Sequence, residues 1–313
     1  MNLPRRMGGR RDRGVALITA MLISAIATMV AANLAWDNAL DVRRTTVNLG
    51  REQAVQVALG AESWVISILQ QDGSDNGTDH LGEVWASELP GLPIEGGEVF
   101  GSVEDLQGKF NINNLIDQEG RVVEQSLLQF QRLLNALGIE PQLAGITADW
   151  IDSNLDASFP DGAEDPIYTG MIPPYRTPNQ PLSSVSELAA IAGMDRAIFR
   201  VLEPHITALP GRTTINVNTA TPAVLQSLDE NITLSDVEGL LQEREGAGFP
   251  DLSASFGTLI TPEMLLQLSD STRFFRLKVI VRIDTVRVTL YSVLQRATNT
   301  GTVTPILRSL GTT

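Results

Sequence analysis

The sequence predicts an α+β protein in which a long N-terminal helix precedes a small antiparallel sheet, and a large all-α domain interrupts that sheet. An uncharged N-terminal run continues into an amphipathic pattern without proline, which predicts the helix. Two regions of alternating apolar and polar residues lie far apart in the chain and predict the strands. Between them lie short segments that often begin with Ser or Thr and end at Gly, as short helices do.

The composition fits a folded protein of about two domains, since the chain has 313 residues and 43% of them are hydrophobic. Its formal net charge is −14, although five arginines stand among the first thirteen residues. Such an acidic surface repels nucleic acid and suits calcium or a basic partner. The absence of cysteine excludes disulfides, thiol redox chemistry and thiolate metal sites.

The N-terminal helix is predicted over residues 15–71. Its first part, Val15 to Trp36, carries no charge and is long enough to cross about 30 Å of hydrocarbon. The arginines before it favour a cytoplasmic N-terminus. A cleaved secretory signal is the competing interpretation, but the helical spacing of apolar residues continues past Trp36. The apolar positions beyond Trp36 are Leu40, Val47, Ala54, Ala58, Ala61, Val65 and Ile68.

A loop rich in Gly, Asp and Ser over residues 71–79 is expected to end the helix. Residues 99–105 then alternate as a weak strand, and stronger alternation begins at Phe275 and continues to Leu290. The two halves of this later region predict an antiparallel hairpin with one buried face. Residues 115–270 between the two β regions are predicted to be short helices, and Ser184 with Glu187 has capping-box spacing.

Several motifs occur in a fixed order along the chain. They are GKFNINNL at 108–115, DWID at 149–152, GAE at 162–164 with Tyr168, PPYR at 173–176 with Asn179 and Pro181, and INVNTA at 215–220. Together they resemble component K of type II secretion systems, a minor pseudopilin, and this resemblance covers nearly the whole chain. It implies a pseudopilin sheet domain interrupted by a large α-domain.

The N-terminus resembles a prepilin leader, in which a membrane peptidase cuts after a glycine. Here that glycine is Gly14, so the resemblance implies a mature chain that begins at Val15, and it also implies methylation. Most pseudopilins carry a glutamate at the fifth mature position, whereas this chain has Thr19. Component K is distinguished by lacking that glutamate. A subunit without it cannot neutralise the terminal amine of a neighbour in the usual way, which suits the end of a fibre.

The resemblance implies a full domain organisation. It consists of a leader at 1–14, a helix at 15–71 with residues 15–36 in the membrane, a sheet domain at 72–114 plus 271–313, and an inserted α-domain at 115–270. The implied protein spans the inner membrane once, with its globular part in the periplasm, and caps or primes the pseudopilus. The implied partners are the minor pseudopilins I and J, the major pseudopilin and the prepilin peptidase.

An acidic segment, DWIDSNLDASFPDGAED, concentrates oxygen ligands of the kind that hard cations bind. Its spacing departs from an EF-hand, because Ala157 and Ala163 stand where glycine and glutamate are needed. Calcium is known in the α-domain of component K, so the resemblance supports calcium here; a solvated acidic loop is the alternative. The candidate ligands are Asp152, Asn154, Asp156, Asp161, Glu164 and Asp165.

Catalysis and nucleic-acid binding have little support. Residues 215–249 look like a helix-hairpin-helix module, but the hairpin is acidic and lacks the paired glycines that contact phosphate. His80 and His205 are the only histidines, and no GxSxG or phosphate-binding loop is present. The chain is therefore predicted not to be an enzyme. The alternatives are a membrane-anchored periplasmic hydrolase with a metal in the acidic loop, and a minor pilin for DNA uptake.

Overall fold

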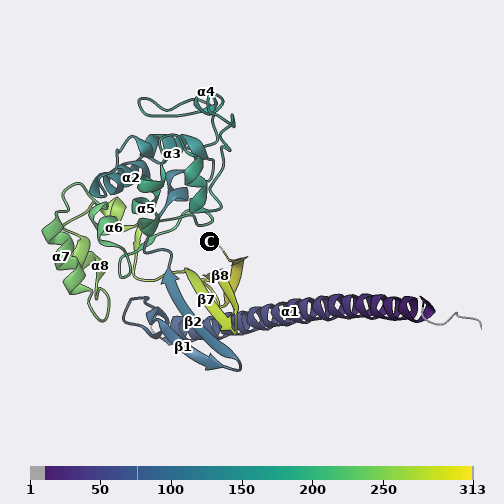
Figure 1. Ribbon diagram of the computed structural model, residues 1–313. Coiled ribbons are helices and arrows are strands. Elements are labelled where there is room, and N and C mark those ends of the chain that lie inside the picture. The colour runs from purple at the N-terminus through teal and green to yellow at the C-terminus, as the bar shows by residue number, and fades with distance from the viewer. Residues whose placement is uncertain (1–10, 76, 312–313) are drawn as a thin grey trace, which may run out of the picture.

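The computed structural model describes residues 11–75 and 77–311, which form one long helix, a five-stranded sheet and a helical insertion (Figure 1). Helix α1, Arg11–Asp75, has 65 residues and projects far beyond the rest of the molecule as a single rod. By length and composition it could cross a membrane, and its most apolar stretch is wholly exposed. The predicted long N-terminal helix is therefore confirmed.

Helix α1 continues past its predicted end at Gln71 and runs through Asp75. The side chain of Arg296 holds this last turn, because its Nη2 donates to Asp72 Oδ2 at 3.0 Å. Gly73 allows the close approach, since a Cβ there would come within 3.1 Å of the Arg296 side chain. The local sequence favours a loop, and a contact with a distant strand overrides that preference.

The sheet is antiparallel throughout, in the order β1-β2-β7-β8-β9. Strands β7 and β8 form the predicted hairpin, with Ile283 paired to Val286 across a two-residue turn. Asp284 adopts a φ of 50° in that turn, a conformation that Asp tolerates better than most residues. The strands are β1 Leu89–Ile94, β2 Gly97–Asp105, β7 Phe274–Ile283, β8 Val286–Arg296 and β9 Val303–Leu310.

The two edge strands were not predicted. Strand β1 contains Pro90 and Pro93, and β9 contains Pro305, so neither shows clean alternation. Proline is tolerated at a sheet edge because its missing N–H can face away from the neighbouring strand. Both strands form because a central strand with an alternating pattern offers them a partner.

Helix α1 packs on one face of the sheet, mainly against β7 and β8. Ala54 and Ala58 are fully buried there against the inward side chains of β7, which include Leu277 and Val281. A charged residue of α1 is buried in this interface: Glu62 is 2% exposed, and it accepts hydrogen bonds from Ser292 and Arg308. Small side chains on α1 let the helix approach the sheet closely.

The insertion between β2 and β7 has its own hydrophobic core, in which the rings of Phe110 and Phe130 stack 5.2 Å apart. It is helical apart from two very short parallel strand pairs. The predicted capping box of Ser184 and Glu187 is present. The elements are η1 Val84–Ala86 before β1, and then β3 Phe110–Asn111, η2 Ile112–Leu115, α2 Glu124–Ala136, α3 Leu143–Ile151, α4 Asp165–Tyr168, η3 Val185–Ala190, α5 Arg196–Leu202, η4 Glu203–His205, β4 Ile206–Thr207, β5 Ile215–Asn216, α6 Pro222–Gln226, α7 Leu234–Glu243, α8 Leu252–Phe256, α9 Pro262–Leu265 and β6 Leu268–Ser269.

Candidate functional site

The exposed half of α1 carries the predicted processing residues. Gly14 and Val15 lie in the helix and are exposed, and apart from the adjacent backbone of α1 no atom of the described residues lies within 4 Å of a Cβ built on Gly14. The Thr19 hydroxyl donates within its own helix to the carbonyls of Val15 and Ala16, each at 3.0 Å. The fifth position after Gly14 therefore holds a neutral, internally bonded side chain and presents no carboxylate.

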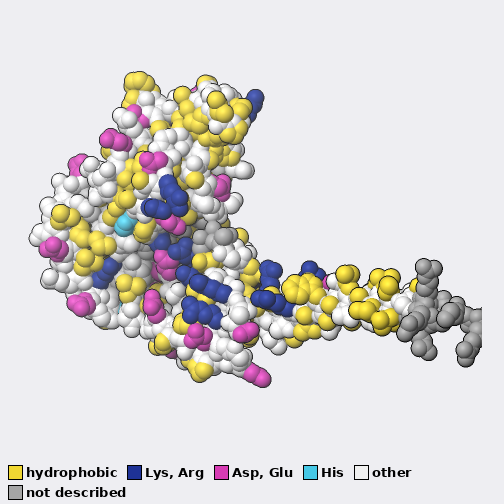
Figure 2. All heavy atoms as spheres, viewed as in Figure 1, with side chains coloured by type: hydrophobic (Ala, Val, Ile, Leu, Met, Phe, Trp, Pro, Cys, Tyr) yellow, Lys and Arg dark blue, Asp and Glu magenta, His cyan; other side chains and the backbone are white. Residues whose placement is uncertain are grey.

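The apolar side chains on this part of the helix are exposed on all sides. Leu17, Ile18 and Ile23 are each at least 63% exposed, and Figure 2 shows yellow side chains along the projecting rod. Such a surface is unfavourable in water, and it needs lipid or other helices around it.

The acidic segment 149–165 lies at one end of the insertion, around α3 and α4. Helix α3 ends with Asp149 buried in its last turn, and Asp152 follows as its buried C-cap. Glu164 is 1% exposed and precedes the first turn of α4. Three carboxylates are thus buried at the junction of two helix ends. Asp149 belongs to the acidic segment but is not among the candidate ligands, and its three-residue spacing from Asp152 places both on one helix face.

Two oxygens of this acidic segment have no hydrogen-bond partner although both are buried. They are Asp149 Oδ1 and Glu164 Oε1. The other oxygens of these residues are bonded, since Ser158 N donates to Asp149 Oδ2 at 2.9 Å and the Thr177 hydroxyl donates to Glu164 Oε2 at 2.9 Å. A buried carboxylate oxygen without a donor is costly, and a bound cation would remove that cost.

The environment of these acids also disfavours their negative charges. Burial raises the pKa of Asp152 to about 6, and the neighbouring charge of Asp149 adds to the shift. Burial raises the pKa of Glu164 as well, against the lowering effect of the hydrogen bond from Thr177. Two buried acids whose pKa values are raised in one segment fit the oxygen-rich donor set that Ca²⁺ takes.

The remaining predicted ligands are placed differently. Asn154 is exposed, and its Nδ2 donates to Asp152 Oδ2 at 2.7 Å. Asp156 is exposed, whereas Asp161 and Asp165 are partly buried. Asp165 accepts from the backbone N–H of Thr177 at 3.2 Å. The structure therefore brings Asp149, Asp152 and Glu164 into the interior and leaves Asp156 toward solvent.

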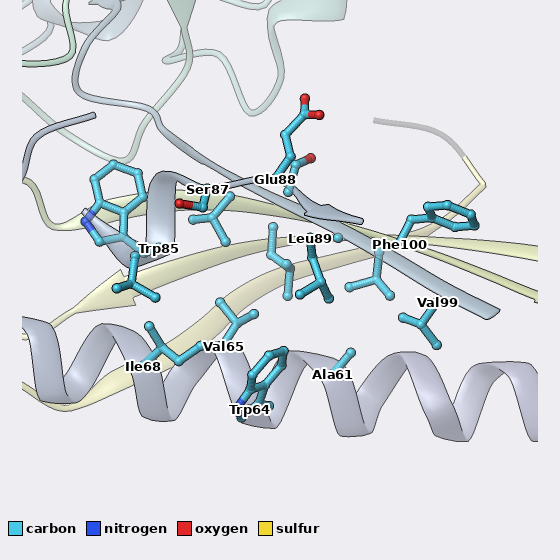
Figure 3. A pocket seen from close by; sticks show the side chains of 16 residues that line it. Ala61, Trp64, Val65, Ile68, Trp85, Ser87, Glu88, Leu89, Val99 and Phe100 are labelled. Carbon is cyan, nitrogen blue, oxygen red and sulfur yellow. The ribbon is translucent and has the colours of Figure 1, made fainter. Parts of the chain in front are cut away.

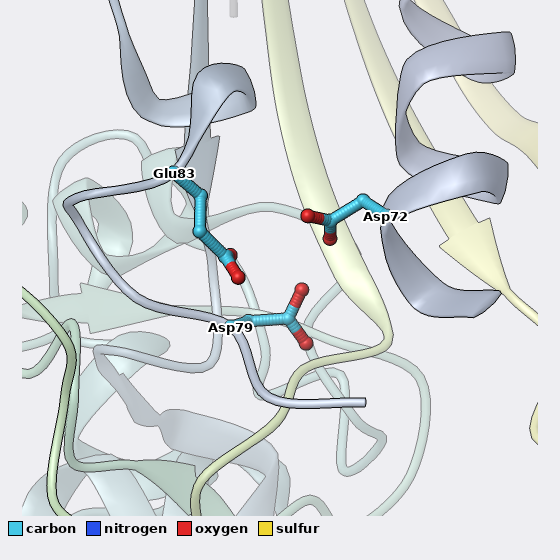
Figure 4. Close-up of side chains that lie close together, drawn as sticks. All are labelled: Asp72, Asp79 and Glu83. Atoms are coloured by element: carbon cyan, nitrogen blue, oxygen red, sulfur yellow. The ribbon is translucent and has the colours of Figure 1, made fainter. Parts of the chain in front are cut away.

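A second acidic cluster lies where α1 ends, and sequence reasoning missed it. Asp72, Asp79 and Glu83 bring carboxylate oxygens within 4.8 Å of one another (Figure 4). Arg296 already supplies the cation, because its Nη1 lies 3.0 Å from Asp79 Oδ1 and its Nη2 lies 3.0 Å from Asp72 Oδ2. Burial raises the pKa of Asp79 to about 7, and Arg296 opposes that shift. This cluster ties the helix end to the sheet.

The asparagines of the GKFNINNL motif are buried and form hydrogen bonds with the backbone of distant segments. Asn113 Nδ2 donates to the carbonyls of Leu182 and Leu209, each at 2.9 Å, and its Oδ1 accepts from Leu182 N at 2.8 Å. Asn114 makes a matching pair of bonds with the backbone of Thr213, at 2.8 and 2.9 Å. The motif thus joins three chain segments of the insertion, which explains its residue types without any catalytic role.

The INVNTA motif links the insertion to the sheet. Asn216 Nδ2 donates to Asp105 Oδ2 at 2.8 Å and to the Asp79 carbonyl at 2.9 Å. The Thr219 hydroxyl also donates to Asp105 Oδ2, at 2.6 Å. Burial raises the pKa of Asp105, and these hydrogen bonds act in the opposite direction. The segment that looked like a DNA-binding module therefore packs against the sheet domain.

The two histidines have structural surroundings. His205 Nδ1 lies 2.7 Å from the hydroxyl of Thr221, which caps the N-terminus of α6, and burial lowers the pKa of His205. His80 Nε2 lies 3.7 Å from Glu83 Oε1 in the cluster at the end of α1. His80 Nδ1 also accepts from the backbone N–H of Gly82 at 3.2 Å. Among the described contacts, neither histidine links a hydroxyl nucleophile to a carboxylate, the arrangement of a catalytic triad.

Comparison with known proteins agrees with the motifs. The family described as type II secretion system protein K matches residues 108–211 and 215–259. Type II secretion system protein K of Pseudomonas aeruginosa is 33% identical, over 96% of this chain and 94% of the relative. The protein K of Klebsiella pneumoniae is 36% identical, over 78% of each chain.

The fold has a solved counterpart. A chain in the crystal structure of the GspK-GspI-GspJ complex from enterotoxigenic Escherichia coli superposes with a TM-score of 0.75. The match covers 86% of this chain and all of the other, at 24% identity. With the sequence similarity to the Pseudomonas and Klebsiella proteins over most of their length, this fold places the chain in the type II secretion system protein K family.

Proposed function

We propose that this chain is a minor pseudopilin that sits at the tip of a type II secretion pseudopilus and primes or caps its assembly. The observation that carries this proposal is the single rod of α1, whose membrane-length apolar part is wholly exposed while its other end is packed against a sheet. One helix thus provides both a membrane anchor and the segment that packs on the globular domain of a fibre subunit. The alternative of a membrane-anchored hydrolase gains no support from the relatives, which are secretion components.

The proposed partners are a neighbouring pair of minor pseudopilins and the major pseudopilin. The structurally similar chain comes from a complex of GspK with GspI and GspJ, and we extend that association to the equivalent proteins here. The insertion comprises the residues between β2 and β7. In Figure 1 the sheet lies between this insertion and helix α1. A bulky domain in that position would obstruct the addition of another subunit above this one.

The proposed location is the inner membrane, with the N-terminus in the cytoplasm and the globular part in the periplasm. The arginines before Val15 support this orientation, because basic residues beside a membrane helix favour the cytoplasmic side. Thr19 supports the place at the tip. Without a carboxylate at that position, the subunit has no acidic group to pair with a neighbour's terminal amine.

Calcium is the proposed ligand of the acidic segment. Asp149, Asp152 and Glu164 would hold it through buried carboxylate oxygens, and backbone carbonyls of the same loop could complete the shell. The cation would offset the repulsion among buried acids and cross-link the end of α3 to the start of α4. Its role would be to stabilise the fold of the insertion.

N-terminal sequencing of the membrane-bound protein tests the proposal. Expressed with the prepilin peptidase, the chain should begin at Val15, and without the peptidase it should keep its leader. Replacement of Gly14 by Ala serves as the control, because it should block cleavage while leaving the exposed helix intact. A chain that stays uncut, or that is cut near Ala35, would refute the pseudopilin assignment.

A further inference from the structure

A set of polar contacts centred on Asp79 holds the insertion against the sheet and the end of α1. Asp79 Oδ2 accepts from Thr272 N at 2.7 Å, just before β7. The Asp79 carbonyl accepts from Asn216 Nδ2 of the insertion at 2.9 Å. Arg296 Nη1 of β8 lies 3.0 Å from Asp79 Oδ1, and the same guanidinium also bonds Asp72 of α1. These contacts, which we call the latch, connect four parts of the chain through one residue.

The charges in the latch are unbalanced. Carboxylate oxygens of Asp72 and Glu83 lie within 4.8 Å of one from Asp79, and the three side chains point toward one another (Figure 4). Within the described part of the chain, Arg296 is the cation that pairs with this group. Several acids around one guanidinium make an additional negative charge costly. The charged or titratable residues around Asp79 are Asp72 of α1, His80 and Glu83 of the following loop, Asp105 of β2, Asp270 before β7, whose carbonyl accepts from Asp79 N, and Arg296 of β8.

A proton on Asp79 removes part of this imbalance. Burial raises the pKa of Asp79 to about 7, against the opposing charge of Arg296. The charges of Asp105 and Asp72 add to the rise. The closed latch therefore favours a protonated Asp79, whereas an Asp79 in contact with water would return toward its ordinary pKa of 3.8. A movement that lets water reach Asp79 therefore releases a proton between about pH 4 and pH 7.

The other side of the same junction has a cleft of about 220 Å³ between the insertion and the sheet. Phe199 of α5 lines it from the insertion, and Leu307 of β9 lines it from the sheet. Asp105, which belongs to the latch side, pairs across strands with Phe275, and Phe275 packs toward α1. The next residue of β7, Arg276, lines the cleft. Because neighbouring residues of a strand face opposite ways, the latch and the cleft lie on opposite faces of the sheet.

Apolar contacts between the latch and the cleft would allow the insertion to move as a body. Leu106, which lines the cleft, forms a small apolar cluster with Leu209 and Phe274, and we call this cluster the pivot. Apolar contacts are not directional, so they tolerate a small rotation. Helix α1 stays with the sheet, since Val65 and Val99 belong to one apolar core beside a hollow of about 190 Å³ (Figure 3).

We infer that the latch is controlled by a proton on Asp79, and that loss of this proton lets the insertion tilt about the pivot and narrow the cleft. The released form is favoured as the pH rises from about 4 to about 7, by up to about tenfold per pH unit for one proton. Above about pH 7 Asp79 is ionised in both forms, so the balance changes no further. The inference concerns the junction inside the chain and does not depend on the proposed function.

Distances between spin labels test the tilt, and the natural chain contains no cysteine to interfere. The full-length protein in detergent would carry Arg196→Cys on α5 and Thr304→Cys on β9, both exposed and outside the lining of the cleft. Double electron–electron resonance should show a mean distance that is shorter at pH 8 than at pH 5, by about 2 Å, the scale of shifts between packed elements. Arg196→Cys with Glu230→Cys, both within the insertion, is the matched pair and should not change.

Substitutions in the labelled protein identify the titrating group. Asp79→Asn keeps an oxygen that can accept from Thr272 N but cannot ionise, so it should give the long distance at both pH values. His80→Gln should keep the full change, because His80 lies beside Glu83 and titrates in the same pH range without bonding Asp79 in the described contacts. Asn216→Ala removes a bond of the latch and should shorten the distance already at pH 5.

The labelled chain without further substitution is sufficient to overturn the inference, whether or not the variants fold. Equal distances across the cleft at pH 5 and pH 8 would exclude a latch controlled by a proton. A change that persists in Asp79→Asn, or that disappears in His80→Gln, would assign the response to another group. A matched pair that changes as much as the pair across the cleft would show a rearrangement within the insertion and would exclude a tilt about the pivot.

Discussion

Among single residues, the buried carboxylates fall into two groups that differ in how their charge is balanced. Asp149, Asp152 and Glu164 are gathered at two helix ends with two oxygens unbonded, whereas Asp79 is paired with Arg296. Within residues 11–75 and 77–311, no salt bridge joins the first group to a basic side chain, whereas Arg296 pairs with the second. The two clusters should therefore respond differently to calcium and to pH.

Calcium should raise the free energy of unfolding of the natural chain by about 2.7 kcal/mol at a concentration 100-fold above its dissociation constant. The double variant Asp152→Asn with Glu164→Gln should lose this gain. Because it also removes charge repulsion, it should be at least as stable as the natural chain when calcium is chelated. Urea unfolding with calcium and with chelator measures both effects.

The control for the calcium experiment is Glu230→Gln, an exposed acid elsewhere in the insertion. It should keep the full response to calcium. A natural chain whose unfolding is the same with calcium and with chelator would contradict the proposed site, as would a double variant that still responds.

Asp79 should make folding stability depend on pH between about 4 and 7. Its pKa is raised to about 7 in the folded protein from an ordinary value of 3.8, so the folded state holds the proton more tightly. Its contribution to stability is therefore largest below pH 4 and decreases as the pH rises toward 7. Asp79→Asn should flatten this part of the profile, as measured by urea unfolding at pH 5 and pH 8. An equal slope in both proteins would exclude Asp79 as the cause.

Among the structural elements, the junction between sheet and insertion combines hydrogen bonds from asparagine side chains with a small apolar cluster of Leu106, Leu209 and Phe274. Asn113 bonds two segments of the insertion, and Asn216 bonds the sheet domain through Asp105 and the Asp79 carbonyl. An amide both donates and accepts, so it can replace the backbone partners that a regular strand would supply. The short parallel strand pairs lie beside these residues for that reason.

Asn113→Ala should lower the free energy of unfolding by about 3 kcal/mol, because it leaves buried backbone groups of Leu182 and Leu209 without partners. Asn231→Ala is the comparison, since Asn231 is exposed and bonds only to the nearby Asp229 among the described contacts. It should change stability by less than about 0.5 kcal/mol. Chemical unfolding of both variants measures the difference in their free energies of unfolding. Equal decreases would contradict a stabilising role for the hydrogen bonds of Asn113.

In the whole molecule, the proposed membrane anchor and the part that packs on the sheet belong to the same helix. The part of α1 that packs on the sheet continues directly into the exposed apolar part, without a break in the helix. Membrane insertion therefore fixes the direction in which the globular part leaves the membrane. A globular enzyme on a simple anchor would not need this continuity.

Replacing residues 15–36 with an unrelated membrane helix should abolish secretion while leaving the unfolding temperature of the globular part unchanged. The sheet core uses residues from Ala54 onward, so the exchange does not touch it. Secretion by an otherwise complete system, measured with and without the exchanged chain, reports the result. A chain that still supports full secretion would behave as a protein on a passive anchor, which is what the hydrolase alternative predicts.

Local sequence patterns were sufficient for the long helix, the β7–β8 hairpin and the capping box at Ser184, because each depends on neighbours in the chain. The order of the motifs along the chain was sufficient to predict the protein family. The composition of the acidic segment predicts a cation site but does not rank its acids, so the burial of Asp149 could not be predicted from it.

Tertiary contacts decided the rest. The last turn of α1 depends on Arg296, and the edge strands β1 and β9 depend on partners already in the sheet. The cluster of Asp72, Asp79 and Glu83 and the apolar hollow between α1 and the β1–β2 hairpin arise only when the sheet lies over one side of the helix. Burial and close approach of distant residues are properties of the packed chain, and no periodicity in the sequence encodes which side of a helix a sheet will leave open.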